Sequence, residues 1–442
     1  MGGSYIFHSL SQKRNLLIMS KAIALIDCNN FYASCEQSID PKIAGKAVVV
    51  LSNNDGCIIA RSSEARALGI SMGTPYFKVK DRLKELGVIV KSSNYELYGD
   101  LSERLMEIVK SYSNSIEIYS IDEAFIKLER GVNNDIRTWA CNLRASIQQN
   151  LGLTISIGIG VNKSQSKIAN LIAKNNHAYA GIFDFTGISK QDIWLEKIRV
   201  EDVWGIGGKL SKRCRLCNIK TALELRDACS YKVKKELGVI GLRLQNELKG
   251  QMCLPLKVTI SPKKDTCISR SFNKPITDLK ELRQAIGTYV VKASEKLRKQ
   301  KQVANSITIF LRTSNFTEPF YSESATEKLN TSTNDTGILM KTAMKLTEKI
   351  FMQNTPFKKA GVIMQDLQTS EYIQLDLLHQ ISPQSMEKKA RLMQTIDQLN
   401  NRFGRGSVDW AICSIDSKLE IRREYPNRYS TLKVLELPIV KT

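Results

Sequence analysis

The sequence predicts an α+β protein with two small sheets and a basic helical segment between them. Two observations carry this prediction. The order strand, helix, strand, strand, helix, strand occurs twice along the 442 residues, and this is the split pattern of a ferredoxin-like sheet. Between the two copies, residues 197–249 hold 13 lysines and arginines against 6 acidic residues and contain only short helical patterns.

The first copy begins with the buried strand 21–27, "KAIALID". Its remaining elements are expected as a helix at 98–112, strands at 116–121 and 123–129, a helix at 134–150 and a strand at 153–160. The segment 37–94 is an insertion between the first strand and the first helix. It holds a strand at 47–51, followed by the pair Asp55-Gly56, which favours a hairpin turn.

The second copy begins with a strand at 265–272. A helix at 278–300 follows, with apolar residues along one face at Leu279, Leu282, Ile286, Val290, Ala293 and Leu297. The remaining elements are expected as strands at 305–313 and 320–325, a helix at 335–351 and a strand at 359–367.

The net charge of +21 points to a polyanionic partner, most often nucleic acid, although a generally basic surface is the alternative. No run approaches the roughly 18 apolar residues of a membrane helix, so we expect no membrane association. Ten scattered cysteines without a secretory signal predict reduced thiols and a cytoplasmic location. Only Cys214 and Cys217 have C-x-x-C spacing, and without a second pair they do not predict zinc.

Three carboxylates are expected to converge in the first sheet. Asp27 ends the first strand, and Asp122 and Glu123 stand at the junction of the two middle strands. The split pattern makes these strands neighbours, so all three reach one sheet edge. Oxygen ligands of this kind select Mg²⁺ or Mn²⁺, and two such ions can hold the oxygens of a phosphoryl transfer. A solvated acidic turn is the alternative.

Several residues around these carboxylates are candidates for nucleotide binding. Lys163 opens a helix, near a positive helix end that suits phosphate, and Arg61 or Arg66 could hold a triphosphate. Phe31 and Tyr32 follow Asp27 and are either core residues or a stacking surface. Gly158 and Gly160 do not form a dinucleotide-binding motif, because the third glycine and the later acidic residue are missing.

The stretch "WGIGGKLSKR" (204–213) places Gly205, Gly207 and Gly208 between helical segments, followed by Lys209. It is not a nucleotide-binding P-loop, because the spacing is short and Leu210 replaces the Ser or Thr. It fits a helix-hairpin-helix turn, whose backbone amides bind a DNA phosphate without reading sequence. A plain glycine-rich helix junction is the alternative.

A family resemblance unites these motifs. The stretches "LIDCNNFYASCE", "SNNDGCIIARSSEARALGISMG", "SSNYELYGDLS", "YSIDEAF" and "GIGVNKSQSKIAN" resemble, in order and spacing, the Y-family DNA polymerases, and most closely their UmuC branch. The similarity extends from about residue 21 to 370 and weakens in the second sheet, where "CISRSF" (267–272) still matches.

The resemblance implies a right-hand polymerase: an N-terminal extension (1–20), a palm (21–187) with fingers inserted at about 37–94, a thumb (188–257) and a little finger (258–370). It implies two Mg²⁺ ions, or Mn²⁺, on Asp27, Asp122, Glu123 and the backbone carbonyl of Cys28. Tyr32 would be the steric gate against ribonucleotides, with Phe31 beside it. Arg66 and Lys163 would hold the dNTP triphosphate, while Ser63 stands where many relatives carry tyrosine. Arg270 would contact DNA.

The tail, residues 371–442, adds a further match. "QLDLL" resembles the peptide that docks on the bacterial sliding clamp, through Gln374, Leu375, Leu377 and Leu378. Leu378 replaces the usual phenylalanine. The stretch 393–411 resembles the C-terminal region of the UmuC branch. The family resemblance implies primer–template DNA as a partner and suggests a UmuD-type dimer and a recombinase filament.

The sequence thus predicts a low-fidelity DNA polymerase that copies past damaged bases as part of an SOS-type damage response. It would join a dNTP to a primer 3′-OH. Two alternatives remain open at this point. One is another nucleotidyl transferase or cyclase on a similar palm, which would not need the basic segment or a clamp peptide. The other is a DNA-binding accessory protein with purely structural carboxylates.

Overall fold

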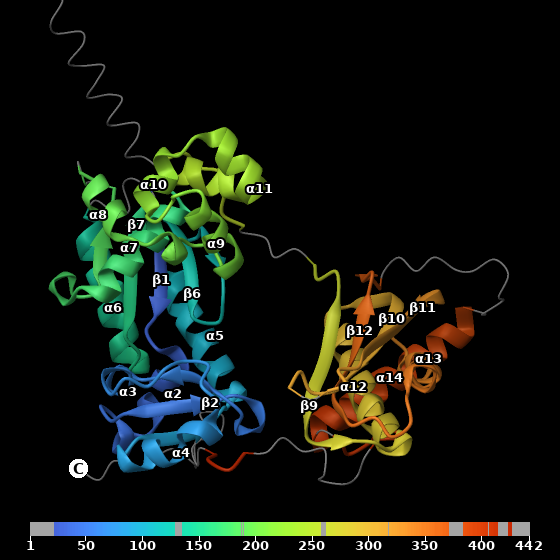
Figure 1. The fold of residues 1–442 in the computed structure, drawn as a ribbon. Coiled ribbons are helices and arrows are strands. Elements are labelled where there is room, and N and C mark those ends of the chain that lie inside the picture. The colour runs from blue at the N-terminus through green and yellow to red at the C-terminus, as the bar shows by residue number, and fades with distance from the viewer. Residues whose placement is uncertain are drawn as a thin grey trace, which may run out of the picture. The chain divides into compact units, whose positions relative to one another are not determined.

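The computed structural model describes residues 22–128, 135–186, 188, 190–257, 262–316, 318–370, 383–404, 406–413 and 423–426 (Figure 1). The chain divides into two compact units, and each is described by itself. Unit 1 comprises residues 1–260 and 423–442, and unit 2 comprises residues 261–422. The N-terminal extension 1–20 lies outside the described residues.

Unit 1 is built on a five-stranded sheet with the order β5-β6-β1-β7-β8. The strands are β1 (Ala22–Cys28), β5 (Ile116–Ile118), β6 (Glu123–Leu128), β7 (Ile155–Gly160) and β8 (Ile182–Asp184). Strand β1 pairs antiparallel with β6 on one side and β7 on the other, which confirms the predicted split pattern. Strand β5 is shorter than predicted, because the chain turns before Glu123.

Helices cover both faces of this sheet. On one face, α5 (Tyr95–Ser111) and α6 (Ile136–Leu151) bury a core with the side chains of Ala24 and Ile26. On the other face, α7 (Lys163–Asn175) lies against β7 and β1. The outer side of α7 packs into a separate core shared with the following helices. Helix α7 is therefore held between the sheet and the helical segment.

Two glycines allow α7 to lie directly on the sheet. A Cβ atom at Gly158 would stand 2.1 Å from the backbone nitrogen of Asn170, and one at Gly160 would stand 2.6 Å from that of Ser166. No real side chain tolerates such approaches. These glycines therefore serve helix–sheet packing, which agrees with rejecting a dinucleotide-binding function for them.

The inserted segment forms a small sheet of its own, the insertion sheet, with the order β3-β2-β4. Its strands are β2 (Val48–Leu51), β3 (Ile58–Arg61) and β4 (Ile89–Ser92), and its helices are α3 (Ser63–Ala67) and α4 (Tyr76–Glu85). Strands β2 and β3 are antiparallel, as the Asp55-Gly56 pair predicts, while β4 is parallel to β2 and lies at an edge. Helix α2 (Phe31–Ile39) leads into this segment from β1.

The basic segment is helical, as predicted. It contains α8 (Asp192–Lys197), α9 (Gly208–Leu216), α10 (Ala222–Asp227) and α11 (Ser230–Leu248), packed around a core that includes Val203, Leu225 and Leu244. In Figure 1 these helices lie at the opposite end of unit 1 from the insertion sheet, with the first sheet between them.

Unit 2 contains the predicted elements in the predicted order. They are β9 (Thr266–Ile276), α12 (Leu279–Lys299), β10 (Gln302–Arg312), β11 (Ser322–Thr333), α13 (Thr336–Ile350) and β12 (Phe357–Gln365), and β13 (Gln368–Thr369) pairs with β10. Its strand order, β11-β10-β12-β9, differs from that of the first sheet and leaves β9 at an edge. An edge suits β9, because Pro275 cannot donate a ladder hydrogen bond.

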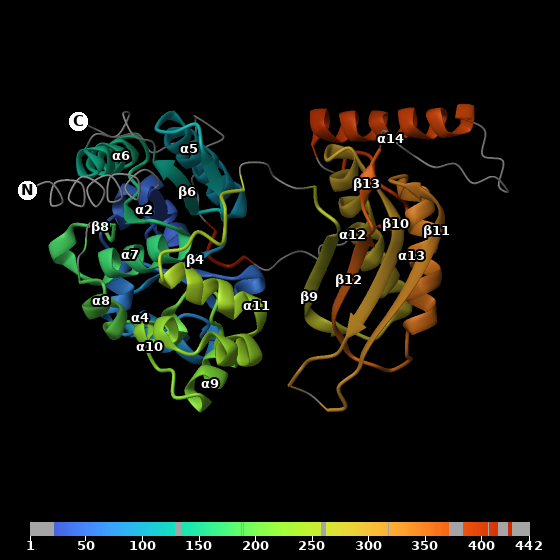
Figure 2. The same ribbon diagram turned by 90° about the horizontal axis from the view of Figure 1, so that it is seen from above.

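Helices α12 and α13 cover one face of the unit 2 sheet and bury its core. Helix α14 (Pro383–Phe403) lies across one end of this unit (Figure 2). It is joined to α12 by the ion pair between Arg298 and Asp397, with both nitrogen–oxygen distances at 2.7 Å. Among the helices described here, none is long and apolar enough to cross a membrane.

The packing of α7 gives the first prediction. Gly158→Ala forces backbone against backbone, so we expect it to lower the free energy of unfolding by about 3 kcal/mol or more. Gly99→Ala is the matched control, because Gly99 lies in α5 with nothing within 4 Å of the position that a methyl group would take, and it should be neutral or slightly stabilising. Urea unfolding measures both. Equal stability of the two variants would contradict the packing described for α7.

Candidate active site

Two of the predicted carboxylates stand directly opposite each other. Asp27, at the end of β1, is paired in register with Glu123, the first residue of β6. Asp122 lies just before β6, in a turn where the amides of Tyr119 and Ser120 both donate to the Glu123 carbonyl. Because Asp122 is outside the strand, strand alternation does not direct its side chain. Its own carbonyl accepts a 2.9 Å hydrogen bond from the Cys28 amide, which ties it to the end of β1.

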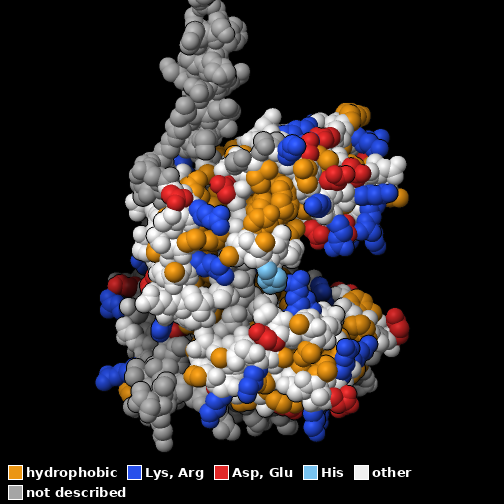
Figure 3. Space-filling view, turned by 90° about the vertical axis from the view of Figure 1, so that its left-hand side faces the viewer, with side chains coloured by type: hydrophobic (Ala, Val, Ile, Leu, Met, Phe, Trp, Pro, Cys, Tyr) orange, Lys and Arg blue, Asp and Glu red, His pale blue; other side chains and the backbone are white. Residues whose placement is uncertain are grey.

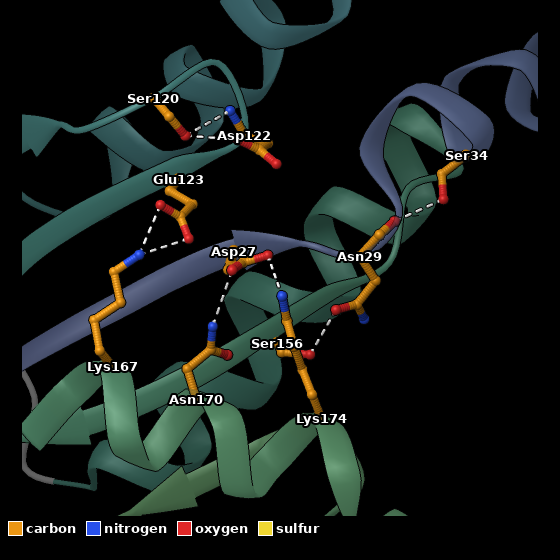
Figure 4. Close-up of polar contacts among 10 residues, drawn as sticks. All are labelled: Asp27, Asn29, Ser34, Ser120, Asp122, Glu123, Ser156, Lys167, Asn170 and Lys174. Carbon is orange, nitrogen blue, oxygen red and sulfur yellow. Dashed lines mark hydrogen bonds and ion pairs between the residues drawn. The ribbon is translucent and has the colours of Figure 1, made fainter. Parts of the chain in front are cut away.

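A row of polar side chains on α7 faces these carboxylates (Figure 4). Lys167 Nζ lies 2.7 and 2.8 Å from the two carboxylate oxygens of Glu123. Asn170 Nδ2 donates to Asp27 at 3.1 Å, and Lys174 Nζ lies 2.5 Å from Asp27 Oδ1. Positions 167, 170 and 174 follow the helical repeat, so the row could have been recognised in the sequence. None of these three residues is among those predicted from the sequence.

Burial and charge set the protonation of the opposed carboxylates. Burial, together with hydrogen bonding to Glu123 and its charge, raises the pKa of Asp27 to about 7 in spite of the nearby Lys174 ammonium. Burial also acts to raise the pKa of Glu123, but hydrogen bonds from Asp27 and Lys167 outweigh it and lower that pKa. Like charges directly opposite each other on neighbouring strands repel, and a proton on Asp27 relieves this repulsion.

Asp122 is held separately from this pair. Its Oδ1 accepts a 2.6 Å hydrogen bond from the Ser120 hydroxyl, and its amide donates to the same hydroxyl at 3.3 Å. Figure 4 shows its other carboxylate oxygen pointing away from Ser120, without a bond to Asp27 or Glu123. Asp122 therefore keeps one oxygen available at the sheet edge.

The prediction of Lys163 as a phosphate-binding residue is not supported. Lys163 is 4% exposed, and its Nζ lies 2.5 Å from Glu117 Oε2. The N-terminus of α7 already holds an anion: the fully buried Glu247 carboxylate accepts from the Ser164 amide at 3.0 Å and from its hydroxyl at 2.6 Å. Lys174 and Lys167, further along α7, are the cations at the carboxylates.

The donor chemistry of the edge fits hard divalent ions. Asp27, Asp122 and Glu123 offer oxygen ligands, and Asn170 Oδ1 beside Asp27 is buried without a hydrogen-bond partner. The Cys28 thiol is excluded as a metal ligand, because it is buried in the core on the opposite face of the sheet. Burial also raises the pKa of this thiol, so it stays protonated. Within the described part of the chain, no group of three His, Cys, Asp or Glu side chains is gathered as a metal cluster. Lysines pair with the carboxylates in this arrangement.

The other predicted nucleotide residues occupy distinct environments. Phe31 is 4% exposed in the core, so it is not a stacking surface. Tyr32 is half-buried, and its ring stacks on that of Tyr98 with centroids 4.5 Å apart. Ser63 is exposed, and its hydroxyl lies 3.1 Å from the Glu64 carboxylate.

The two candidate arginines are distinguished by their partners. Arg61 donates a hydrogen bond to the carbonyl of Ile70, which holds its guanidinium within the insertion. Arg66 is exposed on α3 and has no ion-pair partner among the described residues. The structure therefore leaves Arg66, rather than Arg61, available for a phosphate.

The glycine-rich turn of the helical segment presents open backbone. Gly205 has a φ of +88°, and a Cβ there would stand 3.0 Å from Leu244, so the fold itself requires glycine at this position. Gly207 and Gly208 have nothing within 4 Å, and both are exposed at the start of α9 together with Lys209. The backbone at these two positions is therefore open to the surface, in contrast to that at Gly205.

Basic side chains lie on the face of unit 1 between the helical segment and the inserted segment. Figure 3 shows a hollow on this face of unit 1, between the upper part formed by the helical segment and the lower part formed by the inserted segment. Lysine and arginine side chains lie on both sides of the hollow. This distribution suits a polyanion lying along the first sheet.

Arg270 does not lie on the open face of the unit 2 sheet. It shares a face of β9 with Ile268 and Phe272, which pack toward the helices. Burial raises the pKa of Tyr289 on α12, and the nearby charge of Arg270 opposes this rise. The open face instead carries Arg312, Lys328 and Lys359, because each stands next to a residue that packs toward the helices, namely Leu311, Leu329 and Ala360. The register of β9 with β12 explains this placement, because Arg270 stands opposite the core residue Ala360. The clamp residues Gln374, Leu375, Leu377 and Leu378 lie outside the described residues.

Solved structures place the fold in a known class. A Y-family DNA polymerase chimera of Dbh and Dpo4 matches with a TM-score of 0.63 and 20% identity, covering 79% of this chain and 99% of that one. An insertion ternary complex of Dbh DNA polymerase matches with a TM-score of 0.52, 20% identity and the same coverage. The fold is the right-hand fold of Y-family DNA polymerases, which confirms the predicted fold class.

The sequence comparisons identify the family within that class. The impB/mucB/samB family model matches residues 26–170, its C-terminal domain matches 263–377, and a domain of unknown function matches 390–440. The UmuC protein of Salmonella typhimurium is 40% identical, covering 92% of this chain and 99% of that protein. ImpB of the same organism is 37% identical, covering 95% of this chain and 99% of that protein. DNA polymerase IV 1 of Bacillus subtilis is 28% identical, covering 87% of this chain and 91% of that protein. The chain belongs to the impB/mucB/samB family.

The raised pKa of Asp27 gives a prediction for the metal-free protein. The folded state holds a proton on Asp27 up to about pH 7, whereas the unfolded chain releases it near 3.8. This contribution to stability is complete at low pH and is lost as the pH rises through 7. In a chelator, Asp27→Asn should therefore raise the melting temperature by a few degrees at about pH 8, relative to wild type, and by less at about pH 5. Asp81→Asn, at an exposed carboxylate on α4, is the control. A pH-independent difference between wild type and Asp27→Asn would refute the shift.

Proposed function

We propose that the protein is a DNA-directed DNA polymerase that carries out low-fidelity, template-directed synthesis past damaged bases. The observation that carries the proposal is the pairing of Asp27 with Glu123 in a sheet of a Y-family fold, with Asp122 tied to the end of the same strand through its carbonyl. Membership of the impB/mucB/samB family supports it over the rival functions, a cyclase and a DNA-binding accessory protein. The reaction joins the α-phosphate of a dNTP to a primer 3′-OH and releases pyrophosphate.

Two Mg²⁺ ions, with Mn²⁺ as a substitute, would be held by Asp27, Asp122, Glu123 and the Cys28 carbonyl. When bound, they would lower the pKa of the primer hydroxyl and neutralise charge on the leaving group. Asp27, which holds a proton in the metal-free protein, would bind such an ion as the carboxylate. Lys167 and Lys174, which pair with Glu123 and Asp27, would be displaced, because a divalent cation attracts these oxygens more strongly than an ammonium does.

The lysines released from the carboxylates support nucleotide binding. Lys174 already reaches Asp27 at 2.5 Å and is one-third exposed, so its ammonium lies at the edge where a triphosphate would arrive. Arg66 is exposed and without an ion-pair partner in the described residues, so it is the second phosphate contact that we propose. Tyr32 is the proposed steric gate, with its ring position fixed by stacking on Tyr98.

The two units would offer separate surfaces to DNA. In the helical segment, the proposed thumb, the open amides at Gly207 and Gly208 and the side chain of Lys209 suit a backbone phosphate. In unit 2, the proposed little finger, the open sheet face with Arg312, Lys328 and Lys359 suits the duplex backbone. The inserted segment, the proposed fingers, is small and leaves little surface to test the nascent base pair, which accounts for low fidelity.

Further partners rest on the tail and on the relatives. A sliding clamp would bind at Gln374, Leu375, Leu377 and Leu378, and the similarity to UmuC proteins supports a UmuD-type dimer as a partner. A recombinase filament and an SOS-type role belong to the same proposal. The ten cysteines are all free, in keeping with the expected cytoplasmic location.

Loss of one metal-binding carboxylate tests the proposed reaction. Asp122→Ala should reduce primer extension by a factor of about 10³ or more, because metal binding at the sheet edge is lost, while primer–template binding is kept. Asp184→Ala, at an exposed carboxylate of edge strand β8 in the same sheet, should extend normally. A gel with one dNTP at a time also shows template dependence. Undiminished extension by Asp122→Ala would exclude the assigned site.

The reassignment of the phosphate contact has its own test. Lys174→Ala should raise KM for the dNTP about tenfold or more and leave the folded protein stable, since its ammonium is partly exposed. Lys163→Ala should instead lower the melting temperature, because it leaves the buried Glu117 carboxylate without its ammonium partner. The reverse pattern, with KM raised by Lys163→Ala alone and a stable fold, would restore the original assignment.

A further inference from the structure

A short piece of the far C-terminus lies against the insertion sheet. Residues 423–426 belong to unit 1, although the residues before them, through Cys413, belong to unit 2. In Figure 1 this piece is the short red segment beside the lowest part of unit 1. It falls within the matched domain of unknown function, residues 390–440, so its contacts bear on what that region does.

The segment continues the hydrogen bonding of edge strand β4. The Ser92 amide donates to the Tyr425 carbonyl at 2.8 Å, and the Tyr425 amide donates to the Ser92 hydroxyl at 3.0 Å. An edge strand otherwise presents unpaired backbone groups, and an added extended segment satisfies them. The segment therefore covers the end of the β4 edge.

A buried carboxylate holds the same segment from a second side. Asp55 is 7% exposed, and its two oxygens accept from the Ser92 hydroxyl at 2.7 Å and from the Glu424 amide at 2.8 Å. Asn54 and Asp55 both have positive φ values, of 60° and 50°, a region that Asn and Asp adopt more readily than other non-glycine residues.

The Tyr425 side chain completes the contact. Its hydroxyl and that of Tyr76 lie 2.8 Å apart, and the two rings meet edge to face with centroids 5.8 Å apart. Tyr425 also packs against the apolar core of the inserted segment. Main-chain pairing, a buried acceptor and an aromatic anchor together resemble a peptide-recognition site rather than a chance contact.

We propose that Asp55, Tyr76 and Ser92 form a binding site for the chain's own C-terminal segment, and that Tyr425 is its anchor. The inference does not depend on the proposed polymerase activity. Upstream of the anchor, Trp410, Ile412 and Cys413 pack with the core of unit 2. Within the region of unknown function, residues 410–413 thus pack with unit 2 and residues 423–426 pack with unit 1.

Hydrogen exchange of the full-length protein tests the docking. Because the Ser92 amide donates to the tail, Tyr425→Ala should speed exchange of the β4 amide at Ser92 roughly tenfold or more. Tyr231→Ala is the matched control, since Tyr231 is 78% exposed on α11 of the same unit, and it should leave this exchange unchanged. Identical Ser92 exchange in wild type and Tyr425→Ala would overturn the proposal.

Two milder variants separate specific docking from a folding defect. Tyr76→Phe and Tyr425→Phe each remove one partner of the same hydroxyl contact, so each should speed Ser92 exchange, and the double variant should equal either single one. Strictly additive effects would show that the two hydroxyls act independently and would count against the site. Protection of Ser92 that is lost on dilution would assign the occupant to a second copy and would overturn docking within one chain.

Discussion

The structure of unit 1 depends on two carboxylates that face each other across neighbouring strands. Asp27 and Glu123 are in direct register, so their charges repel, and the fold has to offset this repulsion. Helix α7 does so by placing Lys167, Asn170 and Lys174 on them. It can lie close enough only because Gly158 and Gly160 have no side chains. The helix is fixed on its other side by the core of the helical segment, so the electrostatics of the site and the packing of the unit are coupled.

This arrangement keeps the site assembled while its charges are balanced internally. The ammonium groups and the proton on Asp27 neutralise oxygens that metal ions would otherwise bind. On the proposed function, incoming cations would replace them, and the same lysines would then face an incoming phosphate. Glu247 balances charge at the N-terminus of α7 in a similar way. Its buried carboxylate accepts hydrogen bonds from the amide and the hydroxyl of Ser164 and fixes the helix end. A phosphate could not occupy that position without displacing it.

The two sheets of similar element order are used differently. In the first, β1 is central and brings its terminal carboxylate between two neighbours. In unit 2, the equivalent first strand, β9, lies at the edge, and the middle strands β10 and β12 carry cations on the open face. The C-terminal region adds a third use of strand pairing, because Tyr425 extends the edge of the insertion sheet. Strand pairing thus supports three proposed features of the protein: a reaction centre, a DNA surface and an internal anchor.

Local pattern in the sequence was enough to predict the strands and helices of the two split patterns, most of them within a few residues, and to place Asp27 and Glu123 on neighbouring strands. Hydrophobic period and turn residues act over short distances, and the split pattern leaves little choice of neighbours for β1. What the sequence did not predict depends on contacts with other segments. Lys163 is paired with Glu117, and Glu247 occupies the N-terminus of α7. Arg270 faces the helices because it is in register with the core residue Ala360, and Tyr425 contacts the inserted segment across more than 300 positions. Only tertiary packing decided these, because which face of an element is covered depends on what lies against it.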